Sequence, residues 1–153
     1  MERKSLPMEE ISELLLLQMQ NGGRGKLTVT GYSMMPMLHN GRDSVELTLP
    51  QGPCRKGDVI LYRRDDGRFI LHRIIAVNGE NYICCGDNQA EKESVNHSCV
   101  LARMVAFTRK NRQYTLGHAG YRLYRWLWVG GFPLRRFYIS IRRSIGRIRR
   151  GRK

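Results

Sequence analysis

The 153-residue chain lacks a long apolar segment. No stretch approaches the roughly 20 consecutive apolar residues that a membrane-spanning helix requires. The first residues (MERK) lead into acidic positions and offer neither the apolar region nor the cleavage site of a secretory signal peptide. We therefore expect a cytoplasmic protein without a membrane anchor at its start.

Cysteine is scarce, and its spacing excludes the common zinc motifs. The four cysteines are Cys54, Cys84, Cys85 and Cys99. None forms a Cys-X-X-Cys pair, and His39, His97 and His118 have no ligand partners at metal spacing. Adjacent strand residues point to opposite faces, so Cys84 and Cys85 should lie on different sides of a sheet. We expect buried or half-buried thiols, no disulfide, and neither a metal nor a cofactor.

Acidic residues are absent from the last part of the chain. Residues 94–153 contain 15 Lys or Arg and no Asp or Glu, whereas residues 1–93 contain 12 basic and 13 acidic residues. The net charges are therefore +15 and −1, and the two parts meet near Glu93. The first part is typical of a globular domain, and the second should bind an anionic partner.

Apolar periodicity predicts a mainly β domain that follows a helix. Helical spacing covers residues 7–20, and Asn21-Gly22-Gly23 ends it. Strand patterns separated by turn residues occur at residues 27–30, 44–49, 58–63, 68–77, 82–85 and 100–108. We divide the chain into an N-terminal helix at residues 1–26, a β domain at residues 27–110 and a basic amphipathic tail at residues 111–153.

One stretch, residues 31–38 (GYSMMPML), has the character of a nucleophile turn. Gly31 permits a turn that a residue with a Cβ would resist, and Pro36 fixes its own φ. Ser33 is thereby held on a constrained bend between apolar neighbours, which is how a fold commonly presents a reactive hydroxyl. The alternative is an ordinary Gly-Ser-Pro turn without a catalytic role.

Three further blocks follow in order: KGDVILY at residues 56–62, LHRIIAV at residues 71–77 and GDN at residues 86–88. In this order and at these gaps, the four blocks resemble the type I signal peptidase superfamily of serine peptidases. The resemblance covers residues 27–107. It implies a coiled antiparallel β half-barrel that cleaves peptides with a serine nucleophile and a single-residue general base.

The resemblance assigns roles to four residues. Ser33 is the expected nucleophile, and its backbone N–H is the expected first oxyanion donor. His72 stands where the superfamily carries Lys or His, so the chain resembles the Ser–His branch, with a base whose ordinary pKa is close to neutrality. A carboxylate should orient His72. Asp87 of the GDN block is our first choice, and Glu93, which stands where many Ser–His members carry Asp, is the second.

The implied function is that of a serine endopeptidase that processes a leader or another extended peptide, as in signal peptide processing. One alternative is a self-cleaving repressor of the same fold. Such proteins pair the serine with Lys and carry an N-terminal DNA-binding domain, whereas this chain has His72 and only residues 1–26 before the motif region. A second alternative is a nucleic-acid-binding protein that acts through its basic tail.

The tail has the pattern of two amphipathic helices, at residues 121–129 and 134–148, with Pro133 well placed to begin the second. The apolar stripe of the second helix consists of Leu134, Phe137, Tyr138, Ile141, Ile145 and Ile148. Arginines fill most other positions, which favours an anionic membrane surface as the partner of residues 119–153 over nucleic acid. We therefore expect a peripheral protein at the inner membrane face. The alternative is that Trp126, Trp128 and Phe132 pack on the β domain.

Overall fold

The computed structural model describes residues 15–139 and residue 141. The strands are β1 (Gly25–Thr28), β2 (Ser44–Thr48), β3 (Val59–Arg63), β4 (Phe69–Asn78), β5 (Asn81–Cys85), β6 (Glu93–Asn96), β7 (Val100–Arg109) and β8 (Arg112–Thr115). The helices are residues 15–20, the 3-10 turn η1 (His97–Cys99), α2 (Ala119–Gly130) and a further helix that covers residues 132–139 and 141.

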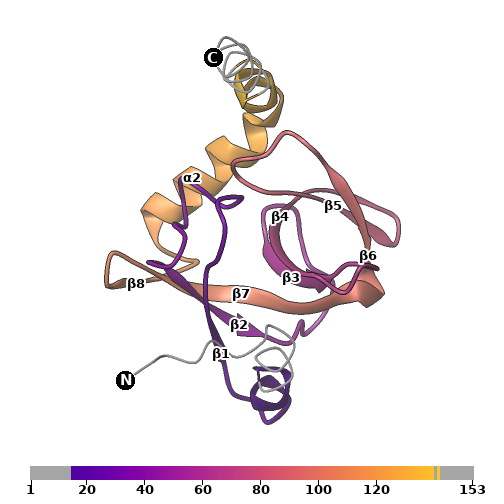
Figure 1. Ribbon diagram of the computed structural model, residues 1–153, viewed down its shortest axis with the longest axis vertical. Helices are drawn as coiled ribbons and strands as arrows, with labels where there is room; N and C mark the ends of the chain where they lie inside the picture. The colour runs from indigo at the N-terminus through magenta and orange to yellow at the C-terminus, as the bar shows by residue number, and fades with distance from the viewer. Residues whose placement is uncertain (1–14, 140, 142–153) are drawn as a thin grey trace, which may run out of the picture.

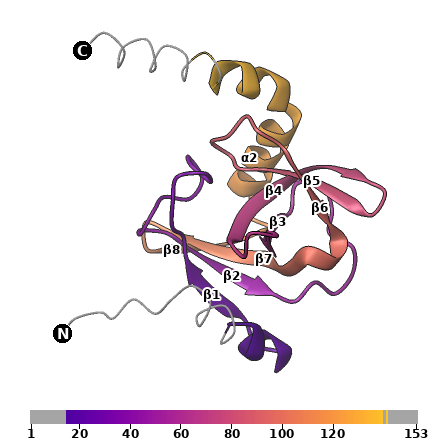
Figure 2. The ribbon, with the colours of Figure 1, turned by 45° about the vertical axis from the view of Figure 1, so that its right-hand side comes forward.

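The strands form a single antiparallel sheet in the order β1-β2-β7-β3-β4-β5-β6, with β8 pairing to β7. The sheet curls into a half-barrel (Figure 1), so the prediction of a mainly β, antiparallel half-barrel is confirmed. Both views place α2 and the helix after it at the end of the sheet opposite to the helix of residues 15–20 (Figure 2). No helix within the described residues is long and apolar enough to cross a membrane.

Two short strands escape prediction from the sequence. β6 (ESVN) buries only Val95, and β8 (RQYT) has no buried side chain. Neither shows an apolar alternation, because each places a single apolar side chain, Val95 or Tyr114, against a core cluster while its backbone pairs with β5 or β7. The structure also places β1 two residues earlier than the predicted strand at residues 27–30.

The predicted boundary after residue 110 falls within a hairpin. Lys110 and Asn111 both have positive φ angles, 49° and 62°, and form the turn between β7 and β8. Beyond the hairpin, Tyr121 of α2 is buried in the main core, with its ring 5.3 Å from that of Phe107. Residues 111–121 therefore fold together with the β domain.

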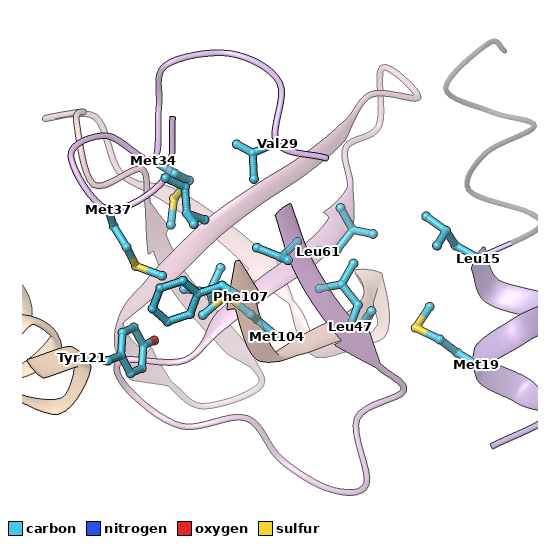
Figure 3. Close-up of a cluster of buried hydrophobic side chains, with 14 residues drawn as sticks. Leu15, Met19, Val29, Met34, Met37, Leu47, Leu61, Met104, Phe107 and Tyr121 are labelled. Carbon is cyan, nitrogen blue, oxygen red and sulfur yellow. The ribbon is translucent and has the colours of Figure 1, made fainter. Parts of the chain in front are cut away.

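The main core lies inside the curl of the sheet (Figure 3). Leu15 and Met19 of the first helix approach Leu47 from one side, and Tyr121 approaches Phe107 from the other. The first helix and α2 thus cover the same core. The first half of the predicted helix at residues 7–20, and the part of the predicted tail helix after residue 141, lie outside the described residues.

The cysteines behave as the sequence predicts. All four are free thiols, and three of them are buried. Cys84 packs in one apolar cluster with Tyr82 and Ile74, and Cys85 packs in another with Ile75 and Phe132. These neighbours lie on opposite faces of the sheet, in agreement with the alternation of side chains along β5.

A buried ion pair joins the sheet to the loop after β5. Arg73 of β4 donates from Nε and Nη2 to the two carboxylate oxygens of Asp87, each at 2.8 Å. Both side chains are at most 1% exposed. Nη1 of Arg73 donates to the Gly57 carbonyl oxygen at 3.0 Å and to the Tyr121 hydroxyl at 3.2 Å, and Nη2 also donates to the Met37 sulfur at 3.0 Å. The pair is therefore fully enclosed and linked to α2.

We expect Asp87→Asn to lower the free energy of unfolding by about 3–5 kcal/mol, because it leaves the buried Arg73 charge without a counterion. Asp66→Asn is the matched control, since it breaks the exposed Arg68–Asp66 pair and should change stability little. Urea unfolding followed by circular dichroism measures both. Equal effects of the two substitutions would show that the buried pair does not stabilise the fold.

Candidate active site

Ser33 lies on the bend that follows β1. Gly31 has φ +83°, and its N–H donates to the Asn40 side-chain oxygen at 3.0 Å. The next peptide units form a compact turn in which the Leu38 N–H donates to the Met34 carbonyl oxygen at 3.0 Å. The side chains of Met34 and Leu38 are buried, while Ser33 remains half-buried. The buried side chains of Met34 and Leu38 thus fix the bend, and Ser33 stays at its partly exposed edge.

The GDN block contacts this bend directly. The Asn88 backbone N–H donates to the Ser33 carbonyl oxygen at 2.7 Å, and the Asn88 side-chain nitrogen donates to the Tyr32 carbonyl oxygen at 3.3 Å. A Cβ at Gly86 would lie 2.7 Å from the Ser33 carbonyl oxygen and 3.0 Å from its Cβ. Only glycine allows this close approach, so the block acts as a clamp on the serine backbone.

His72 is buried on β4, with only 3% of its surface exposed. Its Nδ1 lies 3.2 Å from the Tyr62 hydroxyl and 3.5 Å from a carboxylate oxygen of Glu93. Glu93 is itself fixed by two hydrogen bonds from the Arg64 guanidinium, one of them at 2.7 Å. An ionised carboxylate can only accept a hydrogen bond, so Glu93 favours the tautomer that carries its proton on Nδ1, which leaves Nε2 as the basic nitrogen.

The contacts of the two acids reverse our ranking of them. Asp87 is engaged by Arg73, and Glu93, the second choice, is the carboxylate beside His72. The reason is strand geometry: His72 and Arg73 are neighbours on β4, so their side chains point to opposite faces. The acid that pairs with Arg73 cannot also lie against the imidazole. Asp87 affects the pKa of His72 less than Glu93 and Arg64 do.

Ser33 and His72 line the same cavity, which has a volume of about 110 Å³. Its other walls come from residues 27–30 and residues 69–71, together with Met34 and Leu61. Among the described residues no hydrogen bond joins the Ser33 hydroxyl to the imidazole. Catalytic hydrogen bonds often form fully only when substrate is bound, so a catalytic pair does not require this bond in the free protein.

The two segments that face each other across this cavity have free backbone edges. β1 pairs with β2 on one side only, and β5 pairs with residues 73–78 of β4 but not with residues 69–72. In the described part of the chain, no strand occupies the space between them. Unpaired backbone groups of this kind can accept an added strand.

Burial lowers the pKa of His72 to about 4, although the Glu93 carboxylate opposes the shift; the Arg64 cation lowers it further. Titration near neutrality, expected from the ordinary pKa of histidine, therefore does not hold for this buried ring. Burial raises the pKa of Glu93, but the hydrogen bonds and the charge of Arg64, together with His72 and the Tyr62 hydroxyl, outweigh burial and lower this pKa. At neutral pH the site thus combines a neutral imidazole with an ionised carboxylate.

Two residues of this site are missing from the sequence-based prediction. Tyr62 and Arg64 reach His72 and Glu93 from the end of β3. In the sequence, Tyr62 is one apolar position in a strand and Arg64 is one of many arginines, so neither carries a distinguishing signal. Their roles depend on the pairing of β3 with β4.

The other histidines lie away from this cavity. His39 contacts Arg42 at 2.8 Å, His97 stacks on Tyr82, and His118 lies edge-on to Tyr114. Among the described residues, no cluster of His, Cys, Asp or Glu could hold a metal ion.

Comparison with protein-family models gives no match, and comparison with curated protein sequences gives none either. The assignment of a function therefore depends on the four sequence blocks and on the geometry of this site.

The low pKa of His72 makes the stability of the fold pH-dependent. Below the ordinary histidine pKa of about 6.5, His72 is protonated in the unfolded chain. In the folded chain it stays neutral until the pH approaches 4. The free energy of unfolding should therefore fall by about 3 kcal/mol between pH 6.5 and pH 4 from this group. Urea unfolding of the wild-type chain and of His72→Gln should differ in pH slope over this range.

Nuclear magnetic resonance titration of the His72 ring measures the pKa itself. Arg64→Gln should raise it, because a nearby cation is removed, whereas Arg68→Gln removes an exposed charge and serves as the matched control. A wild-type midpoint near 6.5, or equal pH slopes in the two unfolding series, would contradict the account.

Proposed function

We propose that the chain is a serine endopeptidase of signal-peptidase type, with Ser33 as nucleophile, His72 as general base and Glu93 as the residue that orients it. The observation that carries this proposal is the cavity shared by Ser33 and His72, with the Nδ1 side of the ring held by Tyr62 and Glu93. An imidazole held in this way keeps Nε2 for the serine. This is the division of roles that a Ser–His–acid arrangement requires.

In the proposed reaction, His72 Nε2 takes the proton of the Ser33 hydroxyl as Oγ attacks the scissile carbonyl carbon. The Glu93 carboxylate stabilises the imidazolium that forms. The imidazolium then protonates the leaving amine, and the acyl-enzyme is hydrolysed by water with the same base. The Ser33 backbone N–H is the expected first donor to the oxyanion.

The proposed substrate is an extended peptide that adds as a strand between β1 and residues 69–72 of β4. Both edges have free backbone groups, and Ser33 and His72 lie beside them. Strand addition supplies affinity through main-chain hydrogen bonds and selectivity through side-chain pockets. Because the cavity at Ser33 has a volume of only about 110 Å³, we expect a small residue before the cleaved bond.

We further propose that the C-terminal helices hold the enzyme at an anionic membrane surface. Their outward face carries exposed apolar side chains: Leu123, Trp126, Leu127, Leu134, Phe137, Tyr138 and Ile141. The spacing within each helix is i, i+3, i+4, so each helix carries an apolar stripe along one side. The inward face contains the buried Phe132 and the half-buried Trp128, so the alternative of packing on the β domain holds for these two residues.

Charge and aromatic content support lipid as the partner of this stripe. Trp126 is 71% exposed and Leu134 is 78% exposed, values that are unusual for such large apolar side chains. Residues 94–153 carry a net charge of +15. A basic helix with an aromatic and aliphatic face binds at the headgroup boundary, and each basic residue near an anionic surface contributes roughly 1 kcal/mol.

Ser33→Ala and His72→Ala should each reduce labelling of the protein by a fluorophosphonate, a serine-reactive probe, by a factor on the order of 1,000 or more. The double variant should lose no more than the worse single variant, because the two residues act as one unit. Ser98→Ala, which changes an exposed serine, is the control. Labelling should rise with pH through about 4 and be constant from pH 6 to 8, following the pKa of His72.

Near-normal labelling of His72→Ala, or equal loss in Ser98→Ala, would contradict the assignment of the pair. A labelling rate that still rises between pH 6 and 8 would contradict the low pKa of the base.

The membrane proposal is tested by co-sedimentation with vesicles. The full chain should bind vesicles that contain phosphatidylglycerol, bind purely phosphatidylcholine vesicles weakly, and dissociate as salt increases. The double substitution Trp126→Ala and Phe137→Ala should weaken binding by at least about tenfold, since two large apolar side chains no longer enter the interface. The double substitution Leu17→Ala and Val77→Ala, at exposed apolar positions elsewhere, is the control.

Equal binding by the two double variants would exclude the stripe as the lipid-binding face. If double-stranded DNA binds the full chain more tightly than anionic vesicles at the same salt concentration, the nucleic-acid alternative replaces the membrane.

A further inference from the structure

The C-terminal helices bind the same peptide unit that holds Ser33. The planar unit between Asp87 and Asn88 presents its carbonyl oxygen on one side and its N–H on the other. The carbonyl oxygen accepts from Trp128 Nε1 at 3.0 Å and from an Arg135 guanidinium nitrogen at 2.9 Å. The N–H donates to the Ser33 carbonyl oxygen at 2.7 Å. A single rigid group therefore connects the helices to the backbone of the serine.

The helix residues in this link are held firmly. The Arg135 guanidinium lies over the rings of Trp128 and Phe132, 5.4 and 4.9 Å from their centroids. Trp128 in turn stacks on Tyr124, whose hydroxyl donates to the Asp87 carboxylate at 2.9 Å. The helices thus grip both the side chain and the backbone carbonyl of Asp87.

The direction of the hydrogen bonds makes the link cooperative. A cation on the carbonyl oxygen polarises the peptide unit and strengthens the N–H as a donor at its other end. Because a planar unit does not bend, movement of the helix side chains moves the donor that positions Ser33. The clamp on the serine is therefore completed by residues beyond the β domain.

We infer that Trp128 and Arg135 are positioning residues for Ser33, acting through the Asp87–Asn88 peptide unit. The inference rests on the proposed role of Ser33 as nucleophile. It gives the C-terminal helices an inner face that sets the geometry of the active site, distinct from the outer apolar stripe.

The test uses Trp128→Phe in the full chain, which removes the indole N–H and keeps an aromatic ring. Trp126→Phe makes the same change at an exposed position of the same helix, and both variants are assayed without vesicles, where the outer apolar stripe has no lipid to bind. Trp128→Phe should slow fluorophosphonate labelling of Ser33 by about tenfold, since small displacements of a nucleophile are costly. It should also speed hydrogen exchange of the Asn88 amide by about tenfold, because the bond to the Ser33 oxygen is loosened.

Arg135→Gln provides an independent second case, with Arg135→Lys as the conservative rescue and Arg136→Gln as the control at an exposed neighbour. Lysine keeps a cationic donor near the Asp87 carbonyl oxygen and should recover part of both effects. All variants are compared below their unfolding transitions. The midpoint of the pH–labelling profile should not move, because His72 keeps its surroundings.

The inference is overturned if Trp128→Phe matches Trp126→Phe in both labelling and Asn88 exchange. It is also overturned if exchange accelerates while labelling stays unchanged, because the link then exists without positioning the serine. Failure of the peptidase proposal has a different signature: the wild-type chain itself is not labelled, and the positioning role falls with it even if Asn88 exchange responds.

Discussion

The buried pair of Arg73 and Asp87 is the interaction on which the rest of the structure depends. It joins β4 to the loop after β5, and it reaches the Gly57 turn, the Met37 sulfur and Tyr121 of α2. A charge buried this completely requires a full set of partners, so the elements that supply them are fixed relative to one another. The loop that the pair fixes is the one that clamps the Ser33 backbone.

Strand alternation divides the two acids between two tasks. His72 and Arg73 are adjacent on β4, so their side chains point to opposite faces of the sheet. The Arg73–Asp87 ion pair and the candidate catalytic residue His72 therefore lie on opposite sides of the same strand. Glu93 is placed beside His72 by β6, a strand that pairs with β5. The environment then sets the protonation states: burial keeps the imidazole neutral, and Arg64 keeps the carboxylate ionised.

Much of this arrangement can be read from the sequence, and the remainder has identifiable physical causes. Apolar periodicity locates six of the strands, and Gly31 has the positive φ that the predicted turn before Ser33 requires. β6 and β8 have no such pattern because each is a short strand with a single apolar side chain on a core cluster, Val95 or Tyr114. The sequence therefore offers Glu93 only as the second choice for the acid beside His72, since no local pattern shows that β6 pairs with β5 in this register. The contacts of Trp128 with the Asp87 carbonyl oxygen and with Tyr124 could not be predicted from the sequence either. An amphipathic pattern shows which face of a helix is apolar but not what packs against it.

The central claim, that Ser33 is the reactive nucleophile of the site, is tested most directly by locating a covalent adduct. The full chain is treated with a fluorophosphonate at pH 7, digested, and analysed by peptide mass spectrometry. The account predicts one adduct, on Ser33, formed at a rate that depends on His72. An adduct on another residue, or no adduct on a folded chain, would contradict it.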